Sequence, residues 1–264
     1  TRFRSRQETR DESRAPECET SVTRERIMSS TETFDVVIRN GRVMDPETRL
    51  DAVLNVGVRG GRIVAITAES LEGAAEIIDA TGHVVAPGFI DTHHHWPAPM
   101  GYKLGLRDGR TTMLELEMGV LGSYVAQWYG KREGNVQANF GTASGHEAAR
   151  AFVLDGKGPE EILDYTKSRA ATGWSLQKVN LEQGNRVLQT MDEGLQAGAV
   201  GVGSTLGYMR NGVSAREAFE IQKLSAAYGR QAAFHFRYTP GTEVTEDNGI
   251  QELLANAAAL GAPA

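Results

Sequence analysis

Three consecutive histidines at the end of a hydrophobic run are the residues of this chain best suited to chemistry. The apolar run from Val84 to Ile90 is followed by Asp91, a threonine and then His93, His94 and His95. On an extended backbone alternate side chains point the same way, so His93 and His95 share a face and His94 takes the other. Two neutral imidazoles at a strand end can begin a site for zinc or a similar divalent ion, with Asp91 as a supporting carboxylate or an occasional ligand. The alternative is a histidine-rich surface loop that binds nothing, and the apolar strand before it favours the metal site.

Two carboxylates occupy the next apolar strand, Thr111–Glu117. Glu115 and Glu117 are two residues apart, so they face the same side of an extended strand. Acids in an otherwise apolar strand are costly to bury unless a metal ion or an arginine compensates their charge. The alternative is that both acids lie at a solvated strand end and form only salt bridges.

A third imidazole stands in the apolar stretch Ala232–Arg237. His235 and Arg237 share one face of this stretch, and the flanking phenylalanines take the other. A histidine that ends a strand opposite two others fits a third metal ligand, although a histidine packed in the core is the alternative. Arg237 carries a fork of donors that suits a carboxylate, either of the protein or of a substrate.

The pattern of apolar residues changes once along the chain. Short strands with turns follow one another as far as Val85, and we expect hairpins at Asn40-Gly41 and Gly60-Gly61. From His83 onward strands alternate with helices, which is typical of a parallel α/β sheet or barrel. The strands expected there are Val84–Asp91, Thr111–Glu117, Asn139–Ala143, Ala199–Ser204 and Ala232–Arg237. The helices expected include one opened by Gly158-Pro159, then Gly184–Ala197, Ala215–Tyr228 and a last one from Gln251 to Leu260.

Length and composition divide the chain further. Residues 1–27 are polar and dense in charges of both signs, so we expect residues 1–30 to be a disordered extension. Residues 31–84 are expected to form part of a β-sandwich, and residues 85–264 a partial barrel. Only five strands can be recognised where such a barrel needs about eight, so the sequence has the character of a fragment.

The composition excludes several classes of partner. Hydrophobic residues make up 40% of the chain, but no run approaches the roughly 20 apolar residues that span a bilayer. The net charge of −6 gives no basic surface for nucleic acid. The single cysteine, Cys18, cannot form a disulfide within the chain. Without a signal-peptide pattern, a cytoplasmic location is expected, with no membrane or nucleic-acid partner.

The stretch Ala86–His95 resembles the metal-binding signature of the amidohydrolase superfamily, in which the first barrel strand ends in Asp-x-His-x-His. Upstream, Phe34–Pro46, Gly57–Ile66 and Ile77–Gly88 resemble the opening strands of those enzymes. The resemblance implies an α/β fold, a (β/α)8 TIM-like barrel that is incomplete here, with a small N-terminal β-sandwich module. It also implies Zn²⁺, as one or two divalent ions, and hydrolysis of carbon–nitrogen bonds other than peptide bonds.

Later segments resemble the N-acyl-D-amino-acid deacylase branch, in which a Cys after the second strand replaces the carboxylated Lys that bridges two metals in many amidohydrolases. The register places Met118 at the Cys position. Because a thioether is a poor ligand for a hydrolytic metal, we predict that Glu117 takes the bridging position, with Glu115 as the second choice.

Three further segments carry the same resemblance. Gly145-His146-Glu147-Ala148-Ala149-Arg150 resembles the deacylase Gly-His-x-x-x-Arg segment, so His146 could bind substrate or hold the shape of the site. Ser204–Tyr208 loosely resembles Ser-Thr-Gly-Leu-x-Tyr, and Tyr208 can offer a hydroxyl to a carboxylate or carbonyl. The pair His235 and Arg237 resembles His-x-Arg, where the His is a metal ligand. The predicted metal ligands are therefore His93, His95, Glu117 and His235, and the predicted substrate contacts are Tyr208, His146 and Arg237.

The function that the resemblance implies is removal of the acyl group from an N-acyl-D-amino acid by metal-activated water. Two alternatives stay open: a cyclic amidase of the hydantoinase or dihydroorotase kind, and a fragment that binds metal without catalysis. The family's acid/base Asp ends the eighth strand and a further His ligand ends the sixth. Both positions lie beyond Ala264, so the chain by itself is expected to be inactive.

Overall fold

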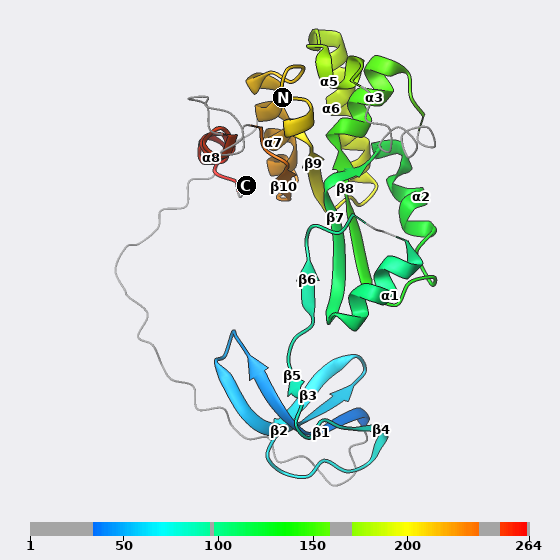
Figure 1. Cartoon of the computed structure of the whole chain (residues 1–264), viewed down its shortest axis with the longest axis vertical. Coiled ribbons are helices and arrows are strands. Elements are labelled where there is room, and N and C mark those ends of the chain that lie inside the picture. Colours follow the sequence, from blue (N-terminus) through cyan, green and yellow to red (C-terminus); the bar gives the residue numbers. More distant parts are fainter. Residues whose placement is uncertain (1–33, 96–97, 159–170, 238–248, 263–264) are drawn as a thin grey trace, which may run out of the picture. The chain divides into compact units, whose positions relative to one another are not determined.

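The computed structural model describes residues 34–95, 98–158, 171–237 and 249–262 (Figure 1). The chain divides into two compact units, with the boundary between Pro87 and Gly88. The expected disordered extension, residues 1–30, and the start of the helix expected at Pro159 lie outside the described residues.

The first unit is one five-stranded sheet made of β1 (Phe34–Asp45), β2 (Leu50–Arg59), β3 (Arg62–Thr67), β4 (Ala74–Asp79) and β5 (Val84–Val85). The strand order is β3-β2-β1-β4, and β5 also pairs with β1. Gly60 and Gly61 have φ angles of 59° and 71°, which confirms the predicted hairpin between β2 and β3.

Two expectations for this unit were wrong. The chain does not turn at Asn40-Gly41: β1 runs through this pair with a bulge, and Asn40 takes a φ of 61°. The described residues of the unit form a single sheet, in which Val53 and Ile63 are 67% and 64% exposed, and the sandwich expected for residues 31–84 stays a prediction. The predicted strand Val84–Asp91 is divided, because β5 pairs with β1 whereas the residues after Gly88 pair in the other unit.

The second unit contains a parallel sheet whose strands lie side by side in chain order. Its strands are β6 (Phe89–Asp91), β7 (Arg110–Val120), β8 (Asn139–Gly145), β9 (Gly201–Ser204) and β10 (Gln231–Phe234), and the order is β10-β9-β8-β7-β6. Every neighbouring pair is parallel. Successive parallel strands joined by helices are the unit of a (β/α) barrel, so the predicted partial barrel is confirmed. All five strands point their carboxyl ends to the same edge.

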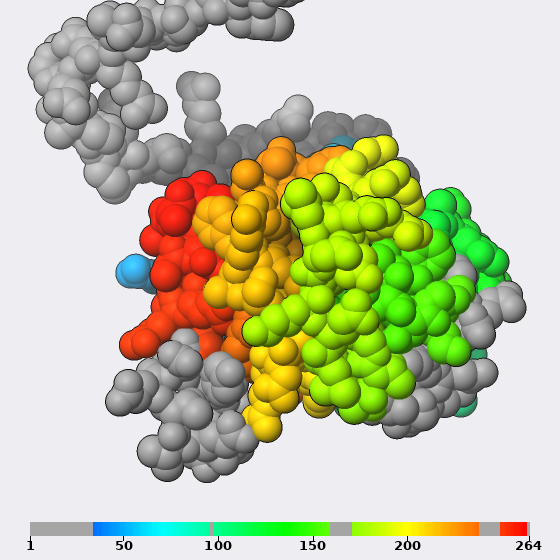
Figure 2. All heavy atoms as spheres, turned by 90° about the horizontal axis from the view of Figure 1, so that it is seen from above, coloured from blue at the N-terminus to red at the C-terminus, as the bar shows by residue number. Residues whose placement is uncertain are grey.

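Helices connect and cover these strands. They are α1 (Pro99–Arg107), α2 (Val125–Gly130), α3 (His146–Asp155), α5 (Gly173–Leu176), α6 (Leu181–Gln196), α7 (Ala215–Ala227) and α8 (Gly249–Leu260), with 3-10 turns η1 (Gly122–Tyr124) and η2 (Leu206–Tyr208). Across the face shown in Figure 2 the second unit follows chain order, from green through yellow to the red of α8. None of the helices in the described ranges is both long and apolar enough to cross a membrane.

One core cluster of the second unit lies between the sheet and helices α6 and α7. Val187, Met191 and Leu195 recur every fourth residue on α6, and all three side chains are fully buried. They pack in one cluster with Val202 of β9 and Ile221 of α7. Burying side chains of this size contributes about 1.5–3 kcal/mol each, so this contact fixes the helix against the strand ends.

Helix α6 begins three residues earlier than its apolar pattern indicated. The Asn180 side chain accepts a hydrogen bond from the backbone N–H of Gln183, and the Gln183 side chain accepts one from the backbone N–H of Asn180 in return. This capping box satisfies two backbone donors that would otherwise lack partners. Helix α7 is capped as well, since the Ser214 side chain accepts from the backbone N–H of Glu217.

We predict that Asn180→Ala lowers the free energy of unfolding by about 1 kcal/mol, because the first turn of α6 loses its cap. Guanidinium unfolding followed by circular dichroism measures the change. Asn180→Ser keeps an oxygen that can accept the same bond and should restore most of the loss. Equal losses in the two variants would contradict a capping role.

Candidate metal centre

The histidine segment turns back over β7 immediately after β6 ends. His93 forms an isolated antiparallel bridge with Glu115, and the N–H of His94 donates to the carbonyl of Leu114 at 3.0 Å. Asp91 holds this turn: its Oδ1 accepts from the backbone N–H of His93 at 3.0 Å, and its Oδ2 accepts from Arg110 at 2.8 Å. The backbone that carries His93 and His95 is therefore held by its hydrogen bonds to β7 and to Asp91.

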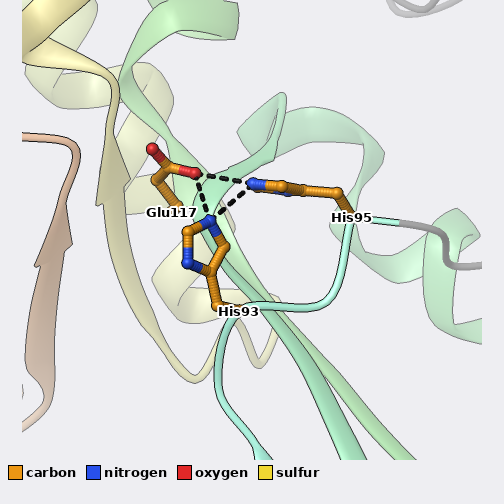
Figure 3. Close-up of side chains that lie close together, drawn as sticks. All are labelled: His93, His95 and Glu117. Atoms are coloured by element: carbon orange, nitrogen blue, oxygen red, sulfur yellow. Dashed lines mark hydrogen bonds and ion pairs between the residues drawn. The ribbon is translucent and has the colours of Figure 1, made fainter. Parts of the chain in front are cut away.

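Adjacent histidines point to opposite sides, as the extended pattern requires. His94 is 5% exposed, and its ring lies 5.3 Å from that of Tyr102. His93 and His95 instead converge, with 2.7 Å between their Nε2 atoms. Oε2 of Glu117 lies 2.7 Å from Nε2 of His93 and 2.6 Å from Nε2 of His95 (Figure 3). These three residues form a group whose ligand atoms could hold one metal ion.

The second oxygen of Glu117 faces the other end of the sheet. Its Oε1 lies 2.5 Å from Nδ1 of His235, which follows β10. The backbone of His235 is held by Ser204 and Gly207, whose hydrogen bonds to it measure 2.9 and 2.8 Å. The structure thus gathers three of the predicted metal ligands, His93, His95 and His235, around the carboxylate of the fourth, Glu117.

The electrostatics of the group favour a positive charge. Burial opposes ionisation of Glu117, but its hydrogen bonds to His235 and His95 outweigh burial, and the pKa of Glu117 falls below its usual 4.5. The hydrogen bond to Glu115 raises the pKa of His95 to about 9, against the opposing effect of burial. Carboxylates that draw a proton onto an imidazole can equally be neutralised by a bound cation.

The donor set fits a divalent ion such as zinc. Two Nε2 atoms and one carboxylate oxygen converge from two chain segments, and imidazole and carboxylate are both ordinary zinc ligands. Glu117 is only 8% exposed, so the charge at its oxygens has little compensation from water. His93 keeps 64% of its side chain exposed, which leaves an open approach to the group.

A bulge in β7 separates the two glutamates. The pairing of β7 with β8 shifts between Glu115 and Val120, and Gly119 in this interval has a φ of 64°. A side chain at Gly119 would also strike the backbone of Ala143, so only glycine fits there. Glu115 lies beside His95, with each of its oxygens 3.0 Å from Nδ1, and is therefore outside the group of three. Met118 lies within the bulge.

The predicted substrate residues differ in their surroundings. Tyr208 is 47% exposed, and its ring lies 4.6 Å from that of His235, so it borders the candidate centre. His146 is fully buried, with Nδ1 2.8 Å from Ser204 Oγ and Nε2 3.0 Å from Glu217 Oε1.

Arg237 is likewise occupied within the protein. It is 6% exposed, and it donates to both oxygens of Glu252 and to the carbonyl of Val213. Because the polar atoms of His146 and Arg237 already have partners inside the protein, this geometry speaks against the predicted contact of either residue with substrate. Their placement corresponds to the alternatives considered for them, a residue that holds the shape of the site and a partner for a protein carboxylate.

The buried network around His146 contains residues that the sequence did not single out as a set. Glu217 accepts from Arg150 at 2.6 Å and faces His146, and Thr205 donates to Glu147 in the same interior region. Arg150 also donates to the carbonyl of Trp174. Glu217 stands 67 residues from Arg150, and no local pattern indicates their pairing.

Comparison with known proteins gives two sets of relatives, and no family model matches the chain. A dihydroorotase from Streptococcus pneumoniae is 53% identical over 64 residues, which are 24% of this chain and 15% of that protein. An allantoinase from Salmonella choleraesuis is 37% identical over 133 residues, 47% of this chain and 27% of the relative. The chain therefore matches about a quarter or less of the length of these relatives.

Solved structures match over more of the chain. A D-aminoacylase described as defining a subset of amidohydrolases has a TM-score of 0.70 at 21% identity, covering 87% of this chain and 50% of that one. An N-acyl-D-glutamate deacylase from Bordetella bronchiseptica gives 0.67 at 21% identity, covering 88% and 50%. An L-hydantoinase from Arthrobacter aurescens gives 0.58 at 19% identity, covering 87% and 52%.

At these identities the solved structures establish the fold, and the sequence relatives add matched residues within it. The chain is similar in fold to solved amidohydrolases, and parts of it are similar in sequence to a dihydroorotase and an allantoinase.

Proposed function

We propose that the protein carrying this sequence is a metal-dependent hydrolase of non-peptide carbon–nitrogen amide bonds. The observation that carries the proposal is the convergence of His93, His95 and Glu117 within 2.7 Å of one another at the carboxyl ends of parallel strands. The functional groups of barrels of this kind gather at that edge.

Each residue of the centre has a distinct task in this proposal. His93 and His95 would hold one ion through Nε2 and Glu117 would hold it through Oε2, and because Oε1 of Glu117 faces His235, this carboxylate could take the bridging position. A divalent ion bound there would lower the pKa of water and polarise an amide carbonyl. Zinc is the proposed metal, as one or two ions, because the Bordetella deacylase was solved in complex with zinc and a D-aminoacylase has a binuclear metal centre.

The proposed substrate is an N-acyl-D-amino acid. The deacylase structures superpose with higher TM-scores than the hydantoinase does, 0.70 and 0.67 against 0.58, over the same share of this chain. No lysine in the described part of the chain follows a strand of the parallel sheet directly, whereas Glu117 stands where a bridging group is needed. Tyr208, half-exposed beside His235, is proposed to offer its hydroxyl to the carboxylate or carbonyl of the substrate.

A cyclic amide is the second candidate substrate. The relatives found by sequence are dihydroorotases and allantoinases, and they reach 53% identity over 64 residues, more than any structural match reported above. The same histidine pair would serve either reaction, so the pair does not distinguish the two candidates.

We expect the natural protein that carries this sequence, loaded with zinc, to hydrolyse N-acetyl-D-amino acids in preference to their L-enantiomers and to hydantoin, dihydroorotate or allantoin. Release of the free amine or of the opened ring measures each reaction. Turnover of the cyclic amides alone would establish the second candidate and reject the first. Turnover of none of them would reject both.

We predict that replacing His93 and His95 together by Ala removes stoichiometric metal from the natural protein, because two of the three converging ligand atoms are lost. Elemental analysis after gel filtration measures the metal content. His83→Ala, a change at an exposed histidine of the first unit, is the matched control and should keep the wild-type content. Unchanged metal in the double variant would reject the site.

We predict that Glu117→Gln abolishes activity and weakens metal binding, because the amide keeps the shape of the side chain but removes the charge that faces three imidazoles. The affinity for zinc, measured by competition with a chelator, and the rate of amide hydrolysis report the two effects. Wild-type values for both in this variant would exclude Glu117 as a ligand.

A further inference from the structure

Glu115 touches the candidate centre without belonging to it. Both of its carboxylate oxygens lie 3.0 Å from Nδ1 of His95, whereas the atoms that face the ion position are the Nε2 atoms of His93 and His95 and Oε2 of Glu117. The two nitrogens of an imidazole point in different directions, so a group bonded to Nδ1 lies to the side of the ring away from the ion. Glu115 would have to break both of these contacts to become a ligand.

The surroundings of Glu115 hold it in this place. The residue is 6% exposed, and its backbone is paired with Thr142 in the β7–β8 ladder and bridges to His93 on the other side. Its Oε1 also accepts from the backbone N–H of Met118 at 3.4 Å. Because these contacts leave the Glu115 side chain little rotamer freedom, it loses little more entropy by holding His95 in one orientation.

A carboxylate beside Nδ1 decides which nitrogen of His95 carries a proton. When an ion occupies Nε2, the one remaining ring proton lies on Nδ1, where the carboxylate of Glu115 can accept its hydrogen bond. The lone pair of Nε2 then points at the place where the ion would sit. The negative charge behind the ring also makes Nε2 a stronger electron donor to a metal.

We propose that Glu115 is a positioning residue for the metal centre: it orients His95, sets the nitrogen that His95 offers to the ion, and strengthens that nitrogen as a ligand. The inference rests on the proposed function, since it presupposes that His93, His95 and Glu117 hold a metal. The proposal gives the two glutamates different roles, although their spacing in the sequence places both on the same face of the strand. Glu117 supplies ligand oxygens, and Glu115 acts through His95.

The same arrangement indicates the class of metal that the centre prefers. A polarised imidazole favours ions that bind nitrogen well, such as zinc and cobalt, over magnesium or calcium, which prefer an all-oxygen environment. Glu115 therefore contributes to metal selectivity although it does not touch the ion.

Two substitutions at Glu115 and two comparison variants test the proposal in the natural full-length protein. Glu115→Gln keeps an oxygen that can accept from Nδ1 but removes the charge, and Glu115→Leu fills similar volume with no acceptor. Glu117→Gln is the comparison for a true ligand. Glu193→Gln, an exposed side chain on α6, is the surface control.

The first measurement is the zinc affinity of each variant by competition with a chelator. We expect a loss of about 10-fold for Glu115→Gln and of about 100-fold for Glu115→Leu, the range found when a carboxylate behind a ligating histidine is removed. Glu193→Gln should match the wild type. A zinc affinity within twofold of wild type in both Glu115 variants would overturn the proposal.

The second measurement is the absorption spectrum of the cobalt(II)-substituted protein, which reports the number and type of ligands. Glu115→Gln should keep the wild-type spectrum at saturating cobalt, whereas Glu117→Gln should change it. A spectrum changed by Glu115→Gln as much as by Glu117→Gln would show that Glu115 is itself a ligand. If the wild-type protein binds neither zinc nor cobalt, the proposed function fails together with this inference, an outcome distinct from normal wild-type binding that Glu115 does not affect.

Discussion

A single buried carboxylate, that of Glu117, joins the parts of the second unit that carry chemistry. One oxygen contacts the two histidines that follow β6, and the other contacts the histidine that follows β10. A carboxylate buried to this degree is stable only when partners compensate its charge. Three imidazoles provide that compensation, and they follow β6 and β10, the two outer strands of the sheet. The same contacts therefore tie the outer strands to β7 and form the candidate centre.

Much of the second unit could be predicted from the sequence because its signals are local. The apolar runs of β7 and β8, the cap at Ser214 and the glycine after α7 each depend on neighbouring residues, and all appear in the structure. The gathering of His93, His95, Glu117 and His235 could also be anticipated, because the carboxyl ends of parallel strands meet at one edge. Their roles as metal ligands remain a prediction.

Other features depend on contacts that no local pattern carries. The spacing of Glu115 and Glu117 places them on one face, but the bulge around Gly119 gives them different neighbours. The pairing of Arg150 and His146 with Glu217 joins residues about 70 positions apart, and this pairing places His146 in the interior. In the first unit, Asn40-Gly41 has the composition of a hairpin, yet pairing along both edges of β1 keeps the strand running through it.

The contact between Glu117 and His235 also records the curvature of the sheet. β7 and β10 are separated by three strand spacings, a distance of about 14 Å in a flat sheet, yet their side-chain atoms meet at 2.5 Å. A flat sheet would leave these side chains pointing in parallel, out of each other's reach. The centre can therefore assemble only on a sheet already rolled toward a cylinder, and any ion that draws these groups together stabilises that roll by the free energy of its own binding.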